Sequence, residues 1–275
     1  MMQKQNLDEI EFTIFDTETT GLEPESGDRI VEIAGIRVRG EERIATFQSL
    51  VNPNRPISSA AFEVNNITQD MLKRAPSIEI VMPKFLKFIQ GSFLCSYNAP
   101  FDLGFLNNEL RLMGENLLDG IMIADMLKMA KRLLPGLERY ALWFVAENLG
   151  IKSRQLHRAL SDVELTLSVF NRLKDILQTK GIFDIMNFSS LFGLKSQFLD
   201  DINNQKVAKI QEAIDLGVKL KIRYLSGSNA QVSERDVVPR EIRQERNRSY
   251  LIGYCCLRNE ERTFRIDGIL HFEII

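Results

Sequence analysis

The sequence of 275 residues lacks any apolar run close to the roughly 20 residues that a membrane-spanning helix needs. Its N-terminal residues, MMQKQNLDEIEF, are polar and acidic and have no apolar centre typical of a secretory signal. It has only three cysteines, Cys95, Cys255 and Cys256, and none belongs to a CxxC pair or to a His/Cys spacing typical of zinc sites. We therefore expect a cytoplasmic protein with no membrane partner, whose buried, reduced thiols take no part in its chemistry.

The sequence also has no surplus of positive charge, since its net charge is −2. From Lys206 onward there are 13 Lys and Arg against 10 Asp and Glu, a net charge of +3, which leaves −5 for the preceding residues. An acidic part can still bind nucleic acid where divalent cations occupy its cleft. A modestly basic C-terminal part could add contacts to phosphates. Charge alone therefore neither excludes nor establishes a nucleic-acid partner.

A β-rich beginning followed by helices is the main pattern that the sequence does contain. Alternating or continuous apolar residues predict strands over 11–16, 29–38, 43–51 and 92–96. Apolar residues spaced by three or four predict helices over 77–90, 102–113, 139–149 and 159–178. Tyr140, Trp143 and Phe144 follow the same helical spacing and are predicted to lie in the core. This order predicts an α/β fold, in which helices cover a mixed sheet.

Residues 179–205 interrupt this pattern with Gly, Asn and Ser, and we predict a partly ordered connector there. After it we predict a short helix over 207–216 and short strands over 218–225, 231–238, 248–257 and 262–271. The predicted organisation is thus a domain over 1–178, a connector over 179–205 and a small, mainly β domain over 206–275.

Five residues with chemistry-bearing side chains stand out by their context. Asp16 and Glu18 lie in FDTETTG at a strand end, where residues i and i+2 project to the same side of the strand. The turn that follows contains Gly21, which allows another backbone to approach closely. Asp102 begins a helix in NAPFDLGFL, and HRALSD places His157 just before the long helix and Asp162 within it.

Hydrolysis of a phosphodiester needs residues of these types. Two divalent ions can activate a water and neutralise the charge that develops on the phosphate. Mg²⁺ or Mn²⁺ takes oxygen ligands from a few carboxylates, and a histidine is a suitable base for the attacking water. Taken singly, an acidic pair at a strand end is most often solvated, and an Asp such as Asp102 is most often a helix cap.

The three segments FDTETTG, NAPFD and HRALSD resemble the three motifs of the DEDDh family of 3′–5′ exonucleases, over about residues 10–178. The resemblance implies a ribonuclease-H-like fold and stepwise removal of nucleotides from the 3′ end of DNA, preferably of a single strand. It also implies two divalent ions, Mg²⁺ or Mn²⁺, held by Asp16, Glu18, Asp102 and Asp162, with His157 taking the proton from water.

The resemblance further implies weaker candidates for nucleic-acid binding. These are Thr19, Leu22 and Phe101 at the terminal nucleotide and Asn98 in the loop around Asp102. Two departures lie along the expected substrate groove. Asn65-Asn66 stands where relatives usually have His-Gly, and Tyr97-Asn98 stands where they often have His-Asn. Neither change affects a metal ligand, so the predicted type of reaction is unchanged. The choice between DNA and RNA as substrate stays open.

Residues 207–270 resemble a WYL domain, although Ser249-Tyr250-Leu251 replaces the Trp-Tyr-Leu signature. The resemblance implies a small Sm/SH3-like β-barrel that binds nucleic acid or a nucleotide-type ligand. Its arginines Arg258, Arg262 and Arg265 could bind phosphates, and Tyr250 could stack on a base. The plainer alternative is a set of solvated arginines over an ordinary barrel core.

Two other functions stay open from the sequence. One keeps the chemistry but takes RNA or short oligoribonucleotides as substrate, and the other is a nucleotide-sensing binding protein with an inactive nuclease fold. The presence of all five motif residues argues against the inactive protein. Protein partners, oligomeric state and pathway stay unknown at this point.

Overall fold

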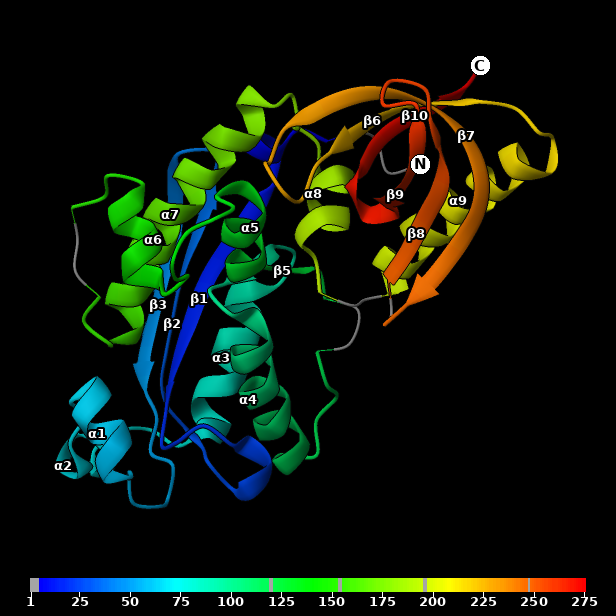
Figure 1. Ribbon diagram of the computed structural model, residues 1–275. Helices are drawn as coiled ribbons and strands as arrows, with labels where there is room; N and C mark the ends of the chain where they lie inside the picture. Colours follow the sequence, from blue (N-terminus) through cyan, green and yellow to red (C-terminus); the bar gives the residue numbers. More distant parts are fainter. Residues whose placement is uncertain (1–4, 119–120, 153–154, 195–196, 247) are drawn as a thin grey trace.

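The computed structural model describes residues 5–118, 121–152, 155–194, 197–246 and 248–275, with the backbone alone for 197–202 (Figure 1). Five strands form a first sheet in the order β3-β2-β1-β4-β5. They are β1 (Glu11–Thr19), β2 (Ile30–Arg39), β3 (Glu42–Leu50), β4 (Phe93–Ser96) and β5 (Ile123–Asp125). β2 is antiparallel to both β1 and β3, whereas β4 is parallel to β1 and to β5. The sheet is therefore mixed, as predicted.

Helices cover both faces of this sheet. They are α3 (Ile78–Ile89), α4 (Ala99–Leu112), α5 (Met126–Leu133), α6 (Leu142–Asn148), α7 (Ala159–Thr179) and α8 (Ile185–Phe192). Two short helices, α1 (Ser59–Asn65) and α2 (Gln69–Lys73), lie beyond the end of the strands (Figure 1). Alternation along β1 sends Phe12 and Ile14 into a core with α5, α6, α7 and α8, and Phe15 into a second core with α3 and α4. Both cores are rich in phenylalanine, which agrees with the 17 Phe in the sequence.

The predicted connector over 179–205 contains an ordered helix that packs on the first sheet. Asp184 caps α8 by accepting a hydrogen bond from the backbone of Asn187. Phe188 is fully buried, and its ring centroid lies 5.6 Å from those of Phe12 and Phe93. α8 thus belongs to the core of the N-terminal part, and the prediction missed it because Asn and Ser separate its apolar residues.

The C-terminal part is a second sheet in the order β10-β6-β7-β8-β9, with antiparallel neighbours throughout. Its strands are β6 (Leu220–Leu225), β7 (Val232–Glu245), β8 (Arg248–Cys255), β9 (Glu260–Arg265) and β10 (Ile269–Ile274). It curves around α9 (Gln197–Asp215), which begins ten residues before the predicted helix (Figure 1). The single strand predicted over 262–271 is wrong, because the 3₁₀ turn Ile266–Gly268 separates β9 from β10.

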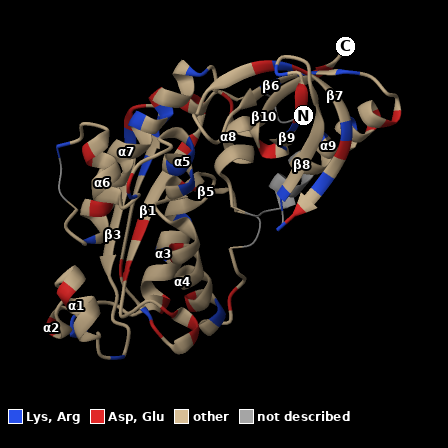
Figure 2. Cartoon of the chain, viewed as in Figure 1, with Lys and Arg blue, Asp and Glu red and all other residues tan. Residues whose placement is uncertain are grey.

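Direct contacts join the two parts. Arg223 on β6 donates a hydrogen bond of 2.7 Å to the carbonyl of Lys180, just after α7. Arg132 on α5 donates one of 3.2 Å to the carbonyl of Leu225. Figure 2 shows acidic residues on β1 and basic residues on α5, β7 and β8. No described helix is both long enough and apolar enough to cross a membrane.

Candidate metal centre

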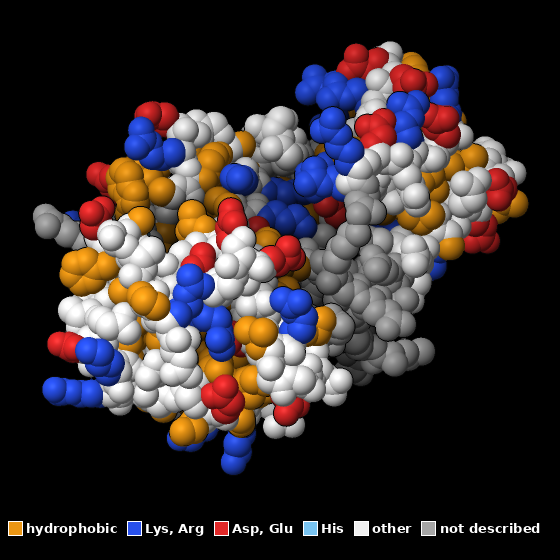
Figure 3. Space-filling view, turned by 90° about the horizontal axis from the view of Figure 1, so that it is seen from below, with side chains coloured by type: hydrophobic (Ala, Val, Ile, Leu, Met, Phe, Trp, Pro, Cys, Tyr) orange, Lys and Arg blue, Asp and Glu red, His pale blue; other side chains and the backbone are white. Residues whose placement is uncertain are grey.

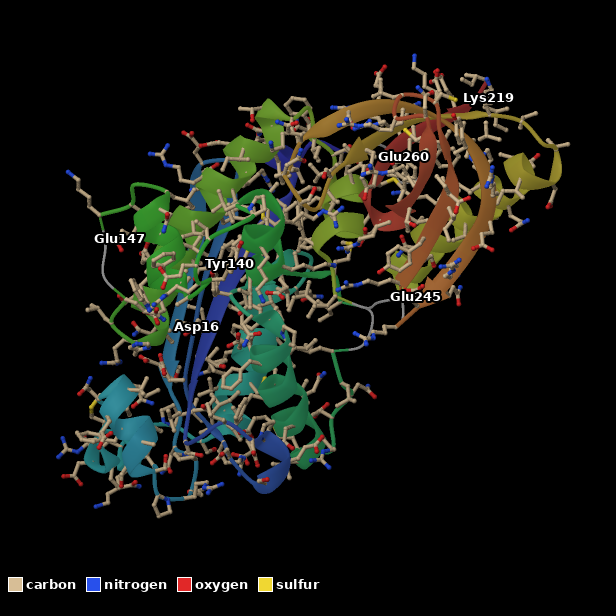
Figure 4. The ribbon with its side chains drawn as sticks, in the orientation of Figure 1. Asp16, Tyr140, Glu147, Lys219, Glu245 and Glu260 are labelled. Atoms are coloured by element: carbon tan, nitrogen blue, oxygen red, sulfur yellow. The ribbon has the colours of Figure 1, made fainter. Side chains whose placement is uncertain are left out.

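Asp16 and Glu18 lie on the central strand β1, which continues three residues beyond its predicted end. Asp16 pairs with Ala34 and Glu18 pairs with Glu32 on β2, so both carboxylates extend from hydrogen-bonded backbone rather than from a turn. Their spacing of two residues places them on the same face of the sheet. Figure 4 shows Asp16 in the middle of the N-terminal part. The backbone of a central strand therefore holds these two side chains in fixed positions.

Asp162, in the first turn of α7, completes a cluster with these two residues. One carboxylate oxygen from each of Asp16, Glu18 and Asp162 lies within 4.8 Å of the other two. All the donors are carboxylate oxygens, which hard divalent cations such as Mg²⁺ and Mn²⁺ prefer. The donor set therefore fits the ions that the sequence predicts.

Asp102 lies beside this cluster, at the start of α4, and is held by hydrogen bonds. Its Oδ1 accepts from the backbone N–H of Thr17 at 2.9 Å and from the Thr17 hydroxyl at 2.7 Å, and its Oδ2 accepts from the Ser96 hydroxyl. The structure thus fixes Asp102 against β1 but does not include it in the three-residue cluster.

Burial, and for Asp16 and Glu18 also the neighbouring carboxylates, disfavours the charged forms of these residues. Burial raises the pKa of Asp16 well above its usual range, and the charges of Asp102, Glu18 and Asp162 raise it further. Burial, followed by the charges of Asp162 and Glu32, raises the pKa of Glu18 to about 8. Burial raises the pKa of Asp102 to about 6, against its hydrogen bonds to Ser96 and Thr17. A bound cation would offset this repulsion, so the electrostatics of the residues also fit a metal centre.

Glu18→Gln is expected to stabilise the protein in EDTA, and more so at high pH. The pKa of Glu18 in the folded state, about 8, lies above its unfolded value of 4.5, so the folded state loses stability as the pH rises through this window. A neutral glutamine removes that loss, which we put at about 1–3 kcal/mol, or several degrees in melting temperature. Melting curves in EDTA between about pH 5 and pH 9 measure it.

Glu63→Gln, at an exposed position on α1, is the matched control and should leave the melting temperature unchanged at each pH. A difference between Glu18→Gln and the unmodified protein that stays constant with pH would contradict the raised pKa of Glu18.

His157 lies at the rim of the cluster, just before α7. Its Nδ1 is 3.9 Å from Asp162 Oδ2, and its side chain is 46% exposed. Its backbone adopts a left-handed conformation with φ of 50°. Asp162 Oδ2 also accepts a hydrogen bond of 2.9 Å from Gln155, and Oδ1 accepts one of 3.2 Å from the backbone of Leu156. Asp162 therefore fixes the loop that carries the histidine, and the imidazole stays open to solvent.

Glu32 is a further residue next to the cluster that the sequence reasoning did not identify as functional. Its fully buried carboxylate accepts two hydrogen bonds from the Arg158 guanidinium, of 2.9 and 3.0 Å, and one of 3.2 Å from the backbone of Ala159. It thereby anchors the residue after His157 and the start of α7. The available signal was one acidic residue within an otherwise apolar strand, since a buried carboxylate is rare unless paired.

The candidates for nucleic-acid binding differ in exposure. Leu22 is 79% exposed, whereas Thr19 is buried and donates a hydrogen bond to the carbonyl of Gly21 at 2.5 Å. The half-buried Phe101 packs its ring 5.0 Å from that of Phe105. Asn98 is exposed in a left-handed conformation at the start of α4, and its side chain forms no capping hydrogen bond. Of these four residues, Leu22 and Asn98 are thus the exposed ones.

In the C-terminal part, the structure brings the four candidate residues to one cavity of about 300 Å³. Tyr250, Arg258, Arg262 and Arg265 all line it. Arg262 forms an ion pair with Glu260 and Arg265 forms one with Asp267, so Arg258 is the arginine of this set with no described ion pair.

Two expectations near the candidate metal centre are wrong. Trp143 is 41% exposed rather than part of the core, and with Gln155 and His157 it lines a groove of about 910 Å³. Gly21 makes room for a side chain rather than for a backbone, because a Cβ there would lie 2.2 Å from Asp28 Oδ2. The buried face of α6 carries Leu142, Val145 and Ala146, so the helical spacing through Trp143 selected the wrong face.

Comparisons with known proteins agree with this geometry. The family model described as an exonuclease of the RNase T type matches residues 13–170, which include all five candidate residues. The chain belongs to the exonuclease family. A second family model, the WYL domain, matches residues 205–274. We therefore refer to the N-terminal part as the exonuclease domain and to the C-terminal part as the WYL domain.

Curated relatives resemble large shares of the chain. A DNA polymerase III PolC-type of Caldanaerobacter subterraneus is 30% identical over 253 residues, which cover 91% of this chain and 18% of that protein. A DNA polymerase III subunit epsilon-like protein of Rhodobacter capsulatus is 39% identical over 180 residues, or 64% of this chain and 25% of that protein. The chain thus spans a quarter or less of each relative.

Solved structures show the same fold. The nuclease domain of 3′hExo, a DEDDh family member bound to rAMP, is 22% identical, with a TM-score of 0.54 over 63% of this chain and 94% of its own. The zinc-bound E. coli ExoI–ssDNA complex is 17% identical, with a TM-score of 0.58 over 89% of this chain and 54% of its own. The exonuclease domain therefore has the predicted ribonuclease-H-like fold.

Proposed function

We propose that this chain is a cytoplasmic 3′–5′ exonuclease that removes nucleotides stepwise from DNA, with a preference for single strands. The observation that carries the proposal is the cluster of Asp16, Glu18 and Asp162, whose oxygens lie within 4.8 Å of one another, with Asp102 fixed beside it. The curated relatives support DNA as substrate through their names, and the ExoI–ssDNA complex supports a single strand.

The carboxylates would hold the two ions in distinct ways. Asp16, Glu18 and Asp162 would hold the ion beside the attacking water, Asp16 would also reach the second ion, and Asp102 would support that second ion. Two bound Mg²⁺ or Mn²⁺ ions would activate the water and neutralise charge on the scissile phosphate. The raised pKa values of Asp16 and Glu18 mean that these carboxylates are fully ionised at neutral pH only with cations bound.

His157 would accept the proton of the attacking water. Its imidazole is accessible from the groove that it shares with Trp143, where a nucleotide can approach. Asp162 lies 3.9 Å from Nδ1 and would stabilise the imidazolium that forms. Glu32, through Arg158 and Ala159, would keep the histidine loop and the start of α7 in register with β2.

An end-labelled degradation assay tests this function. A 5′-labelled single strand of DNA should yield a ladder that shortens one nucleotide at a time with Mg²⁺ or Mn²⁺, and no ladder with EDTA. A matched RNA oligomer should be degraded more slowly. A faster reaction on RNA would instead favour the oligoribonucleotide exonuclease, since the two substrates differ chiefly at the 2′-hydroxyl. Binding of the strands without any turnover would overturn the proposal in favour of a nucleic-acid-binding protein with an inactive nuclease fold.

A further inference from the structure

A basic cavity of about 380 Å³ lies between the exonuclease domain and the WYL domain. Its walls include Lys128, Lys131 and Arg132 from α5, and Gly227, Arg248 and Arg265 from the WYL domain. Figure 3 shows Lys and Arg side chains gathered in the hollow between the two domains. Side chains from both domains thus build a single site.

The cations of this cavity outnumber the acidic groups around them. Five of the lining side chains are Lys or Arg, and two carboxylates, Asp125 and Asp267, lie close to them. Burial lowers the pKa of Lys128; the charge of Asp267 opposes this, and the charges of Arg265, Arg132 and Arg248 add to it. The described residues therefore leave a net charge of about +3 in a partly enclosed space, an arrangement that favours an anion.

Several of these cations have unused hydrogen-bonding capacity. Arg132 is 95% buried, since its relative exposure is 5%, and its Nε has no hydrogen-bond partner among the described residues. Lys131 and Arg248 are exposed, and no described acidic residue forms an ion pair with either. A buried donor without a partner is unfavourable in free energy, and a ligand oxygen in the cavity would satisfy it.

The cavity lies at the same end of the parallel strands β1, β4 and β5 as the proposed catalytic carboxylates. Asp125, at the end of β5, forms one of its walls and pairs with Ser96 on β4, whose hydroxyl donates to Asp102. Asp125 Oδ1 also accepts the backbone N–H of Asn98, at 3.2 Å. Because β4 lies between β1 and β5, Asp125 is two strand spacings from the strand of Asp16, or about 10 Å across the sheet, and the cavity extends from Asp125 away from β1 to α5 and the WYL domain.

The cavity continues into the one that Tyr250 and Arg258 line on the WYL domain. The two cavities share Gly227 and Arg265 as lining residues. The second one offers Tyr224 and Tyr250 next to its arginines, and aromatic rings of this kind can stack on bases. Two adjoining sites, the first rich in cations and the second in tyrosine and arginine, fit an extended strand better than a single free nucleotide.

From these observations we infer that the cavity beside α5 binds backbone phosphates of the single-stranded substrate, a few nucleotides away from its 3′ end. This inference rests on the proposed exonuclease function. The strand passes from the catalytic carboxylates over the end of β5 to α5 and then onto the WYL domain. Lys131 and Arg248, one from each domain, contact the phosphates, and binding of a long strand therefore depends on both domains together.

The double variant Lys131→Ala/Arg248→Ala tests the inference. Both side chains are exposed, so their removal leaves the fold intact. We expect the KM for a DNA strand of about 20 nucleotides to rise at least tenfold and the kcat to stay within about twofold. The slope of the logarithm of the binding constant against the logarithm of the salt concentration should decrease by about one to two, because two phosphate contacts are lost. A dinucleotide, whose one bridging phosphate lies at the metal-binding carboxylates, has no phosphate left for the cavity and should keep its KM.

Lys209→Ala/Lys219→Ala is the matched control, because it removes the same charge from exposed positions of the WYL domain that do not line the cavity. Figure 4 shows Lys219 at the far end of that domain. This variant should keep the KM of the unmodified protein on both substrates. The charge-conserving variant Lys131→Arg/Arg248→Lys should restore most of the affinity for the long strand.

Binding of a fluorescent dT strand in EDTA, followed by anisotropy, separates this inference from the proposed function. Weaker binding by the Lys131→Ala/Arg248→Ala protein supports the inference even if no strand is ever degraded. Equal binding by the variant and the unmodified protein would overturn it. The inference would also be overturned if the variant lost affinity for inorganic pyrophosphate or for a nucleoside diphosphate while its KM for the long strand stayed unchanged. The cavity would then bind a free ligand instead of the strand.

Discussion

Asp16→Asn is expected to lower kcat by about 10⁴-fold or more, which corresponds to about 5 kcal/mol of barrier. Asp16 is the residue that the proposed mechanism places at both ions, so its loss removes a ligand from each. An asparagine has nearly the same shape but no charge, and its single oxygen is a weaker ligand for a hard cation. Single-turnover degradation of a labelled strand in Mg²⁺ measures the effect, and titration calorimetry with Mn²⁺ should show that the ion no longer binds.

The same substitution should stabilise the protein in EDTA. Burial and the charges of Asp102 and Glu18 hold the pKa of Asp16 far above its usual range, so the neutral asparagine relieves repulsion in the folded state. A higher melting temperature together with lost turnover shows that the inactive variant is folded. Asp70→Asn, at an exposed position on α2, is the control and should change neither quantity. Turnover by Asp16→Asn at the normal rate would contradict the assignment of Asp16 as a metal ligand.

Local rules predicted the parts of the site that depend on neighbours in sequence. The spacing of Asp16 and Glu18 by two residues required only an extended backbone for both carboxylates to share a face, and β1 provides it. The spacing of apolar residues by three or four predicted the long helix that carries Asp162. This helix begins at Ala159, as predicted. The convergence of Asp162 with β1 could be expected only from the family resemblance, because no local pattern fixes contacts between residues so far apart.

What the sequence did not reveal depends on tertiary contacts. β5 has only three residues and leads directly into α5, which has eight. Neither the two-residue repeat of a strand nor the 3.6-residue repeat of a helix therefore extends far enough to be recognised in the sequence. No local pattern distinguishes Lys128, Lys131 and Arg132 from solvated charges, although Arg132 is buried and donates a hydrogen bond to the WYL domain. Glu32 was likewise placed on its strand, but its role became visible only with its partner Arg158.

His157→Ala is expected to lower kcat by about 10²–10⁴-fold with little change in metal binding, because general-base catalysis typically contributes that much. The imidazole lies next to Asp162 but is not part of the three-carboxylate cluster. Single-turnover degradation of a labelled strand measures the rate, and titration calorimetry with Mn²⁺ measures the binding of the ion.

His271→Ala gives a matched control, because the sequence has two histidines and His271 is exposed on β10 of the WYL domain. Its kcat should equal that of the unmodified protein. Added imidazole separates a base from a residue that merely supports the loop before α7. Free imidazole can accept the proton in the space that the alanine leaves, so it should restore part of the rate, whereas it cannot replace a side chain that only holds the loop. A His157→Ala protein with an unchanged kcat would show that another group accepts the proton.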